Sequence, residues 1–495
     1  MNEADFNREG PPPTAGRTGQ FPETSALPEI LSEGPQSARS PARPLLAWVV
    51  ILLVSAFVID LQMRRSNGGA RLTGGEMAND LQAKYLVGVS QISREVLTQP
   101  SAREGFTGDR RIKHLRWALL LHAVGDPALA RQELQQLEGI PDEATEEQRD
   151  LVRAVTGLIA AEAGPANPAP QPAPEDLELI RTQFGWLGRL ASTSSVGETA
   201  PVREQMLGQA RWTMVALFGL FAVGALALLI GVGLLVGWIV CAVTGHLRFQ
   251  LRCPTGTGGY YAETFALWFV AFFGLSFLMG WVAPPQLALT AAGVAAGLSL
   301  LTLFWPVWRG VPARQVRDEL GITWPQGGWR EIVCGVLGYL GGLPLVFVGL
   351  LLTLLLMRWQ TLLTGTALFA FAEPPVHPII EPLARGSFWI RMQAVAVVLL
   401  VPITEEIMFR GVLYRHLREV FGRWGWLVSL FFSLLISSLL FAVIHPQGAL
   451  GVPVLAAVAI VLALLREWRA SLIAPIVTHM IVNGVTTTLV LLIFA

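Results

Sequence analysis

Charged residues are scarce in this chain of 495 residues. Only 15% of its residues are Asp, Glu, Lys or Arg, whereas about 25% is usual for a soluble domain. This shortage excludes an ordinary soluble enzyme. Basic and acidic residues balance at 36 each, and only two are lysines, so no positive field attracts nucleic acid. We therefore expect no nucleic-acid partner.

Cysteine is equally sparse, since Cys241, Cys253 and Cys334 are the only three in the sequence. They show no C-x-x-C spacing, and all three lie in or beside apolar runs. Neither a disulfide framework nor a zinc ribbon can be built from them. We expect no cofactor.

Long apolar runs are what the chain has instead, and hydrophobic residues make up 53% of it. A helix needs about 20 apolar residues to cross a bilayer. Nine runs reach or approach this length, and they occupy residues 44–63, 212–239, 260–283, 286–307, 332–357, 392–418, 427–445, 452–465 and 471–494. The predicted fold class is therefore all-α: a polytopic transmembrane helix bundle in the lipid bilayer.

The composition changes along the chain divide it into five parts. Residues 1–43 are rich in Pro, Gly, Ser and Glu, which predicts a disordered tail. The run 44–63 begins too late and is too long for a cleaved signal peptide, so we expect a membrane anchor helix. Residues 64–210 hold nearly half of all charged residues and predict an inserted soluble helical domain. Residues 211–391 are expected to form the N-terminal part of the bundle, and residues 392–495 its C-terminal core.

One helical hairpin can be identified within the soluble domain. Apolar residues recur at helical spacing from Ile112 to Leu137 on both sides of a break at Gly125-Asp126-Pro127. The junction resembles that of tetratricopeptide hairpins, but such repeats need about three copies for stability. A generic hairpin is the better interpretation. We hypothesise that this domain binds a protein partner and selects substrates.

Arginines are unevenly distributed among the loops between the predicted spans. With the N-terminus in the cytoplasm, two arginines fall in the short outer loops, Arg358 and Arg385. Eleven fall in the inner loops: Arg248, Arg252, Arg309, Arg314, Arg317, Arg330, Arg415, Arg418, Arg423, Arg466 and Arg469. The positive-inside rule then predicts a cytoplasmic N-terminus and an external soluble domain. The Arg-rich composition suggests a bacterial plasma membrane.

Ionisable and amide side chains are concentrated on three of the last apolar segments. Each charged group costs a few kcal/mol at the centre of a spanning helix, so each needs a reason. The six residues are Glu405, Glu406, Arg410, His445, His479 and Asn483.

Helical spacing gives these residues a geometry. Glu406 and Arg410 are four residues apart and can pair on one face, while Glu405 is rotated by roughly 100°. His479 and Asn483 are also four apart, so an imidazole and an amide point the same way.

Helix length places two of the three segments at comparable depth. At 1.5 Å per residue, Glu405 lies ~20 Å above the turn near Gly422 and His445 lies ~27 Å above Leu427, so the two can meet inside the bilayer. Because Pro446 disfavours helix at the residue before it, His445 should end its helix beside irregular backbone that can retain water.

The motifs EEIMFR, FAVIH and HMIVN follow one another on successive apolar helices over residues 392–490. In this order they resemble the motifs of the CAAX-protease and bacteriocin-processing family. Those proteins are intramembrane glutamate endopeptidases, and they include CAAX prenyl proteases and lysostaphin-resistance-like proteins. The resemblance implies an endopeptidase that acts on a membrane-associated or lipid-modified protein or peptide, with no metal.

The resemblance also implies a role for each site residue. Glu405, with His445, would activate the hydrolytic water. His479 and Asn483 would stabilise the oxyanion, a contribution of roughly 3–4 kcal/mol per donor. The ion pair of Glu406 and Arg410 would support the site.

Plainer interpretations stand beside these. Glu406 and Arg410 could form a purely structural pair, and Asn483 could be an interhelical hydrogen-bonding residue. Zinc is the main chemical rival, because Glu405, Glu406, His445 and His479 are all zinc-type ligands, although no H-E-x-x-H occurs. The whole protein could also be non-catalytic, a scaffold or immunity protein that retains the polar core. A transporter is disfavoured because no inverted repeat is visible.

Three further features are weaker. Ser299 in Gly297-Leu298-Ser299 lacks the glycine that follows a nucleophile elbow. Prolines around His377 and Glu381 prevent a shared helical face and predict an outer loop. The arginines 415, 418 and 423 are interpreted as topology determinants at the cytoplasmic edge.

Overall fold

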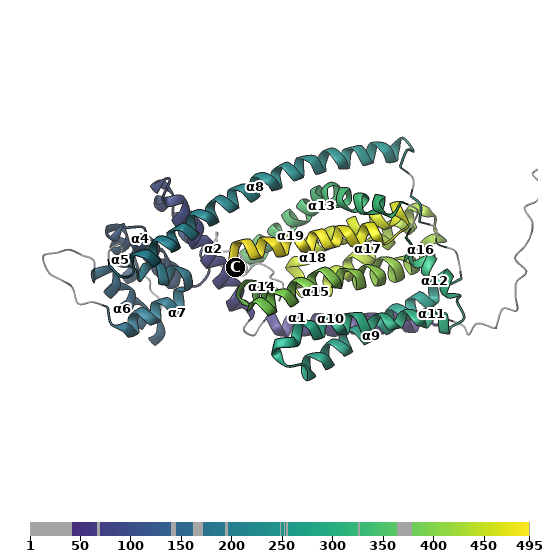
Figure 1. Ribbon diagram of the computed structural model, residues 1–495, viewed down its shortest axis with the longest axis horizontal. Coiled ribbons are helices and arrows are strands. Elements are labelled where there is room, and N and C mark those ends of the chain that lie inside the picture. The colour runs from purple at the N-terminus through teal and green to yellow at the C-terminus, as the bar shows by residue number, and fades with distance from the viewer. Residues whose placement is uncertain are drawn as a thin grey trace, which may run out of the picture. The chain divides into compact units, whose positions relative to one another are not determined.

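The computed structural model describes residues 42–66, 70–139, 145–161, 172–193, 197–247, 249–251, 253, 256–324, 327–363 and 379–494. Every regular element in these ranges is a helix, so the all-α class is confirmed (Figure 1). The predicted disordered tail lies, except for its last two residues, outside the described residues, and so does His377.

Nine helical segments in the described ranges are long and apolar enough to cross a bilayer, as predicted. They identify an integral, multi-pass membrane protein. In chain order they are α1 (Pro44–Ser66), α8 (Ala200–Val243), α9 (Gly258–Val282), the run of η3 (Pro285–Leu287), α10 (Ala288–Ser299), η4 (Leu300–Leu303) and α11 (Phe304–Trp308), then α13 (Gly328–Leu363), the run of α15 (Phe388–Glu406), η5 (Ile407–Leu413) and α16 (Tyr414–Gly422), then α17 (Trp426–Val443), α18 (Gly448–Arg469) and α19 (Ile473–Phe494). Two shorter helices, α12 (Ala313–Leu320) and α14 (Ile380–Arg385), lie between spans.

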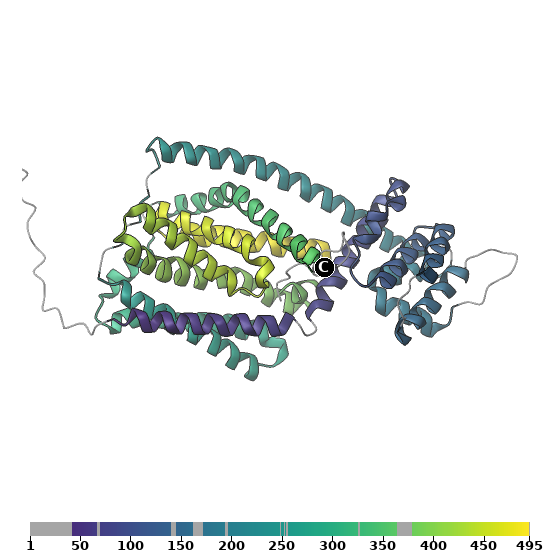
Figure 2. The ribbon, with the colours of Figure 1, turned by 180° about the vertical axis from the view of Figure 1, so that it is seen from behind.

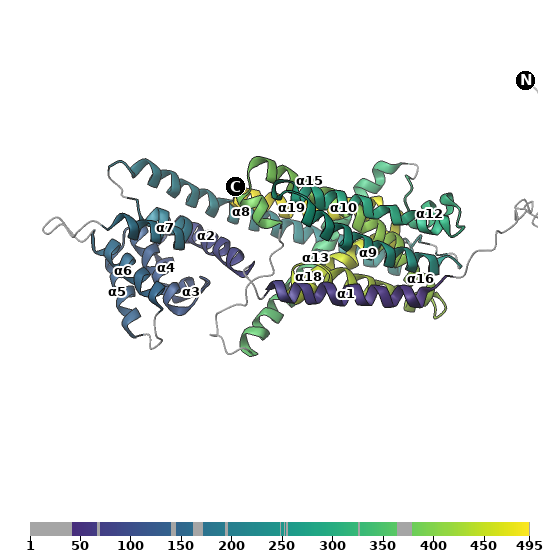
Figure 3. The same cartoon turned by 90° about the horizontal axis from the view of Figure 1, so that it is seen from below.

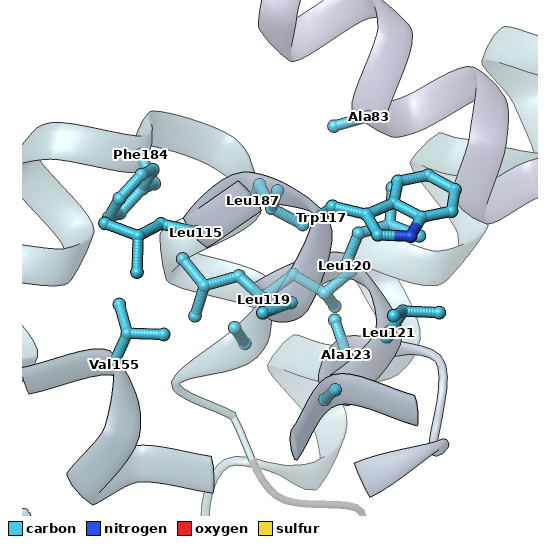
Figure 4. Packing of buried hydrophobic residues seen from close by; sticks show 14 of the residues in the cluster. Ala83, Leu115, Trp117, Leu119, Leu120, Leu121, Ala123, Val155, Phe184 and Leu187 are labelled. Atoms are coloured by element: carbon cyan, nitrogen blue, oxygen red, sulfur yellow. The ribbon is translucent and has the colours of Figure 1, made fainter. Parts of the chain in front are cut away.

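The part of the chain between α1 and α8 is also helical. It contains α2 (Ala70–Ser90), η1 (Arg94–Thr98), α3 (Pro100–Glu104), α4 (Arg110–Ala123), α5 (Pro127–Gln135), η2 (Gln136–Gly139), α6 (Glu146–Ala161) and α7 (Pro174–Ala191). The predicted hairpin is α4 and α5, with Gly125 at φ +84° between them and Asp126 accepting a hydrogen bond from the Leu129 amide. Leu115, Leu119 and Val155 lie in one apolar core with residues of α2 and α7 (Figure 4).

The predicted anchor helix α1 is a component of the bundle. It lies along α9 and also contacts α17 and α18 (Figure 2, Figure 3). Ala47 and Ile51 are buried in the same core as Phe265 and Phe409. In addition, the Trp48 indole donates a hydrogen bond to His416 Nε2 at 3.0 Å. Such specific packing shows that α1 supports the bundle as well as crossing the membrane.

Helix α13 packs closely against α18 and α19 because glycines face them. A Cβ on residue 338 would lie 2.5 Å from Leu465 Cδ1, and one on residue 342 would lie 2.7 Å from Val461 Cγ1. Small residues let spanning helices approach where water provides no hydrophobic driving force between them. This contact fixes α18 and α19, which carry parts of the site.

Two of the three arginines interpreted as topology determinants, Arg415 and Arg418, are buried, and their role in setting the topology stays a prediction. Arg415 pairs with Glu319 at 3.0 Å and with Glu419 at 2.7 Å, and Arg418 pairs with Glu467 at 2.6 Å. Carboxylates of α12, α16 and α18 neutralise them. A count of arginines in the loops could not show these pairs. Only Arg423 of the three is exposed, with its guanidinium 4.7 Å from the Trp424 ring centroid.

Candidate active site

The polar residues of the last spans meet around Glu405, at the end of α15. One carboxylate oxygen, Oε1, lies 3.9 Å from His445 Nε2, and Oε2 lies 3.6 Å from His479 Nε2. These separations exceed a direct hydrogen bond but are within reach of one bridging water. The Glu405 side chain keeps 17% of its surface exposed. The carboxylate thus lies between two imidazoles and remains accessible.

Glu406 has a different environment from its neighbour. Its side chain is fully buried, and its Oε1 accepts hydrogen bonds from Arg410 Nη1 and His479 Nδ1, both at 2.8 Å. Arg410 also donates to the Ala459 carbonyl of α18 at 3.2 Å. The Arg410 guanidinium neutralises Glu406, and the hydrogen bond from His479 Nδ1 to Glu406 orients that imidazole. Of the two glutamates, Glu405 is the accessible one.

The backbone that carries these residues is irregular on both sides of the glutamates. Pro402 lies inside α15 and has no N–H, so the Val398 carbonyl loses its helical donor. After Glu406 the chain makes a π-helical turn, η5, of a kind often found at functional sites. Sequence spacing predicted a plain helix here and gave no sign of the wider turn.

Asn483 supplies the donor that Pro402 removes. Its Nδ2 donates to the Val398 carbonyl at 3.1 Å, which links α19 to α15. The sequence predicts that Asn483 and His479 point at a common oxyanion, but the structure gives them different partners. The Val398 carbonyl accepts one of the two amide hydrogens of Asn483. The oxyanion role of Asn483 therefore stays a prediction that depends on its second amide hydrogen.

His445 lies just after α17, which ends at Val443 as the following Pro446 predicts. Its Nδ1 is 2.6 Å from the Phe441 carbonyl oxygen. Since a carbonyl can only accept, Nδ1 carries the hydrogen, and in the neutral ring Nε2 is the acceptor that faces Glu405. The Phe441 ring packs 4.2 Å from the His445 ring and 4.6 Å from the Arg410 guanidinium, measured at the ring centroids. This aromatic side chain keeps the polar groups apart and in place.

His479 connects the two glutamates. With Nδ1–H donating to Glu406, its neutral Nε2 is an acceptor that faces a Glu405 oxygen. Two acceptors 3.6 Å apart need a hydrogen between them, either from a water or from a proton on one group. The arrangement therefore suits storage and movement of a proton.

Ser299 and Glu381 are not part of this cluster. Ser299 is buried and accepts a hydrogen bond from the Trp268 indole at 3.0 Å, so it is a core residue. Glu381 is exposed in the first turn of α14. Within the described ranges, no group of three or more His, Cys, Asp or Glu side chains is arranged to hold a metal ion.

Gln62 of α1 is a site neighbour that sequence reasoning missed. Its Nε2 donates to the Ile444 carbonyl at 2.8 Å, directly before His445. The last carbonyls of a helix lack helical donors, and an unpaired one is costly in a low-dielectric setting. The only signal in the sequence is a lone amide near the end of an apolar run. Gln62 thus holds the turn that carries His445.

If His445 takes part in the peptide hydrolysis that the sequence resemblance implies, we expect Gln62→Leu to lower its rate by about tenfold, because misplacing a reacting group is costly. Initial rates and their pH profile measure this. Gln62→Asn, which retains an amide donor, should recover part of the loss. Rates and pH profiles identical to those of the unaltered protein would show that Gln62 does not position His445.

The fold and site together define a polytopic membrane protein with an acid–imidazole cluster buried among its last spanning helices. Residues 387–485 match the model of one protease family, described as Type II CAAX prenyl endopeptidase Rce1-like. The match is consistent with the CAAX-protease and bacteriocin-processing resemblance and covers about a fifth of the chain. It contains all six predicted site residues. Searches of curated proteins and of solved structures gave no match.

Proposed function

We propose that the C-terminal core is an intramembrane glutamate-type endopeptidase that hydrolyses a peptide bond in a membrane-associated or lipid-modified protein. The observation that carries this proposal is the Glu405 carboxylate between His445 and His479, at 3.9 and 3.6 Å. A water held there would contact both a base and an imidazole. The match of residues 387–485 to a protease family supports the same reaction class.

The reaction needs no covalent enzyme intermediate. Glu405 accepts a proton as the water oxygen attacks the scissile carbonyl carbon, which gives a tetrahedral oxyanion. His445 and His479 supply hydrogen-bond donors when protonated, and the second amide hydrogen of Asn483 is a further candidate. The C–N bond then breaks as the stored proton passes to the leaving amine. Water is consumed, and a carboxylic acid and an amine are formed.

Purified protein in detergent, incubated with quenched peptides in unmodified and lipid-modified form, tests the proposal. We expect hydrolysis that continues in the presence of a chelator. Loss of activity with the chelator and its return with zinc would favour the metal alternative. No hydrolysis of any peptide, together with no uncleaved precursors in membranes that lack the protein, would favour the non-catalytic scaffold or immunity protein.

We also propose that the N-terminus is cytoplasmic, in a bacterial plasma membrane, and that residues 64–210 lie outside. The arginine distribution among the loops supports this orientation. Protease added to intact spheroplasts should cleave within residues 64–210, because the positive-inside rule places this charged segment outside. Protection of the segment until the cells are lysed would reverse the orientation.

A further inference from the structure

A polar cleft of about 480 Å³ lies in the helical part between α1 and α8. Helices α2, α4 and α7 form its walls, and Phe106, Phe184 and Leu187 give it an apolar floor. Its volume is in the range of ordinary ligand sites. No residue of the cleft belongs to the proposed active site, so its occupant is a separate question.

The cleft depends on a break in α7. Gly185 interrupts this helix with φ 53° and ψ −126°, a conformation that other residues rarely adopt. The Asp80 carboxylate of α2 receives the Trp186 amide at 3.1 Å just beyond the break. A Cβ at residue 185 would lie 2.8 Å from Asp80 Oδ1, so only glycine fits. Because only glycine can make this break and Asp80 holds it, the two halves of α7 are fixed relative to α2.

A second set of hydrogen bonds, through Thr107, fixes α2 and α4 to each other. Asn79 and Thr107 form two reciprocal bonds of 2.8 Å, side chain to side chain and amide to side chain. Arg116 donates to the Thr107 carbonyl at 2.9 Å, and its guanidinium lies 5.8 Å from the Phe184 ring centroid. The cleft is therefore shaped without a ligand, which reduces the entropy lost on binding.

Charges of the two signs occupy different walls. Helix α2 contributes Glu76 and Asp80, whereas α7 contributes the exposed Arg181 and Arg189, and α4 contributes Arg116. Burial lowers the pKa of the Arg116 guanidinium, although Asp80 and Glu76 act against that shift. Three guanidinium groups and two carboxylates thus line the cleft, which leaves an excess of one positive charge.

We propose that this cleft binds an extended acidic peptide segment, whose carboxylates pair with Arg181 and Arg189. Arginine forks match carboxylates in bidentate geometry. The two arginines lie on opposite sides of the break at Gly185, so they suit two carboxylates along one chain rather than a single small anion. If the proposed function holds, the segment belongs to a substrate, but peptide binding itself does not depend on catalysis.

The test uses the full chain carrying Glu405→Gln, so that no peptide is cleaved. The probes are fluorescein-labelled hexapeptide libraries with two glutamates fixed at each spacing, and matched libraries with glutamines, followed by fluorescence anisotropy. We expect the glutamate libraries to bind at least tenfold more tightly. Arg181→Gln with Arg189→Gln should abolish that preference, whereas Arg94→Gln, at another exposed arginine, should keep it.

Equal binding of both libraries, or an unchanged preference in the double variant, would overturn the proposal. Succinate that competes as well as the best peptide library would also overturn it and would indicate a site for small dicarboxylates. The thermal midpoint should be the same for all variants, because the substituted arginines are exposed. Failure of the Glu405 activity test would leave a positive binding result intact, so the two proposals fail separately.

Discussion

Glu405→Gln is expected to lower the rate of peptide hydrolysis by about 10²–10⁴-fold, the usual contribution of a general base. Glutamine has nearly the same shape but cannot accept the proton of the attacking water. The 3.9 and 3.6 Å separations from His445 and His479 leave room for that water in the variant too. Substrate should therefore still bind, and kcat should fall much more than KM changes.

Initial rates on the best quenched peptide measure the effect, with the thermal midpoint as the control for folding. Glu381→Gln is the matched control, because it makes the same chemical change at an exposed position in α14. It should retain full activity. If the Glu405 variant hydrolysed the peptide at the unaltered rate, the assignment of the base would be wrong.

The second large effect concerns stability, at the Glu406 and Arg410 pair. Arg410→Met should lower the free energy of unfolding by about 3–5 kcal/mol, because it leaves a fully buried carboxylate without its cation. The loss should be about 3 kcal/mol if Glu406 finds other hydrogen-bond partners within the membrane when the chain is unfolded. Unfolding in mixed micelles measures it.

Removing both charges should be far less harmful. The double variant Glu406→Gln with Arg410→Met has no unpaired charge, and its amide oxygen still accepts the His479 N–H. We expect it to regain most of the lost stability but little of the activity, because His479 no longer faces an anion. A double variant no more stable than Arg410→Met alone would show that the ion pair is not what the single substitution breaks.

A surface pair with the same spacing provides the control. Arg64 and Asp60 are also four residues apart and 2.8 Å from each other, but their side chains are 76% and 49% exposed. Arg64→Met should change the free energy of unfolding by about 0–1 kcal/mol. The contrast between the two arginines measures the effect of burial for two pairs with the same sequence spacing.

Local pattern was enough to predict several parts of the site. The end of α17 before His445 follows from the covalent structure of Pro446, and the facing of Glu406 and Arg410 follows from helical spacing. The number of spans follows from the lengths of apolar runs. Each of these depends on interactions within about one helical turn or one segment. The catalytic roles of the site residues stay predictions.

Contacts between distant segments could not be predicted in the same way. Asn483 and Val398 are 85 residues apart, and Gln62 and Ile444 are 382 apart, so no periodicity relates them. The burial of Arg415 and Arg418 has the same origin, because their partners Glu319 and Glu467 come from other helices. A charge count along loops cannot distinguish a paired arginine from a solvated one.

The sequence by itself determined that this is a multi-pass helical membrane protein with acidic, imidazole and amide groups on its last spans, because hydrophobic length and helical spacing are local properties. Only the tertiary structure decided which distant groups are hydrogen-bonded to each other. His479 donates to Glu406, Asn483 donates to the Val398 carbonyl that Pro402 leaves without a helical donor, and Gln62 of α1 donates to the Ile444 carbonyl before His445. The reason is that buried donors and acceptors must be satisfied in a medium without water, and packing decides which distant group does so.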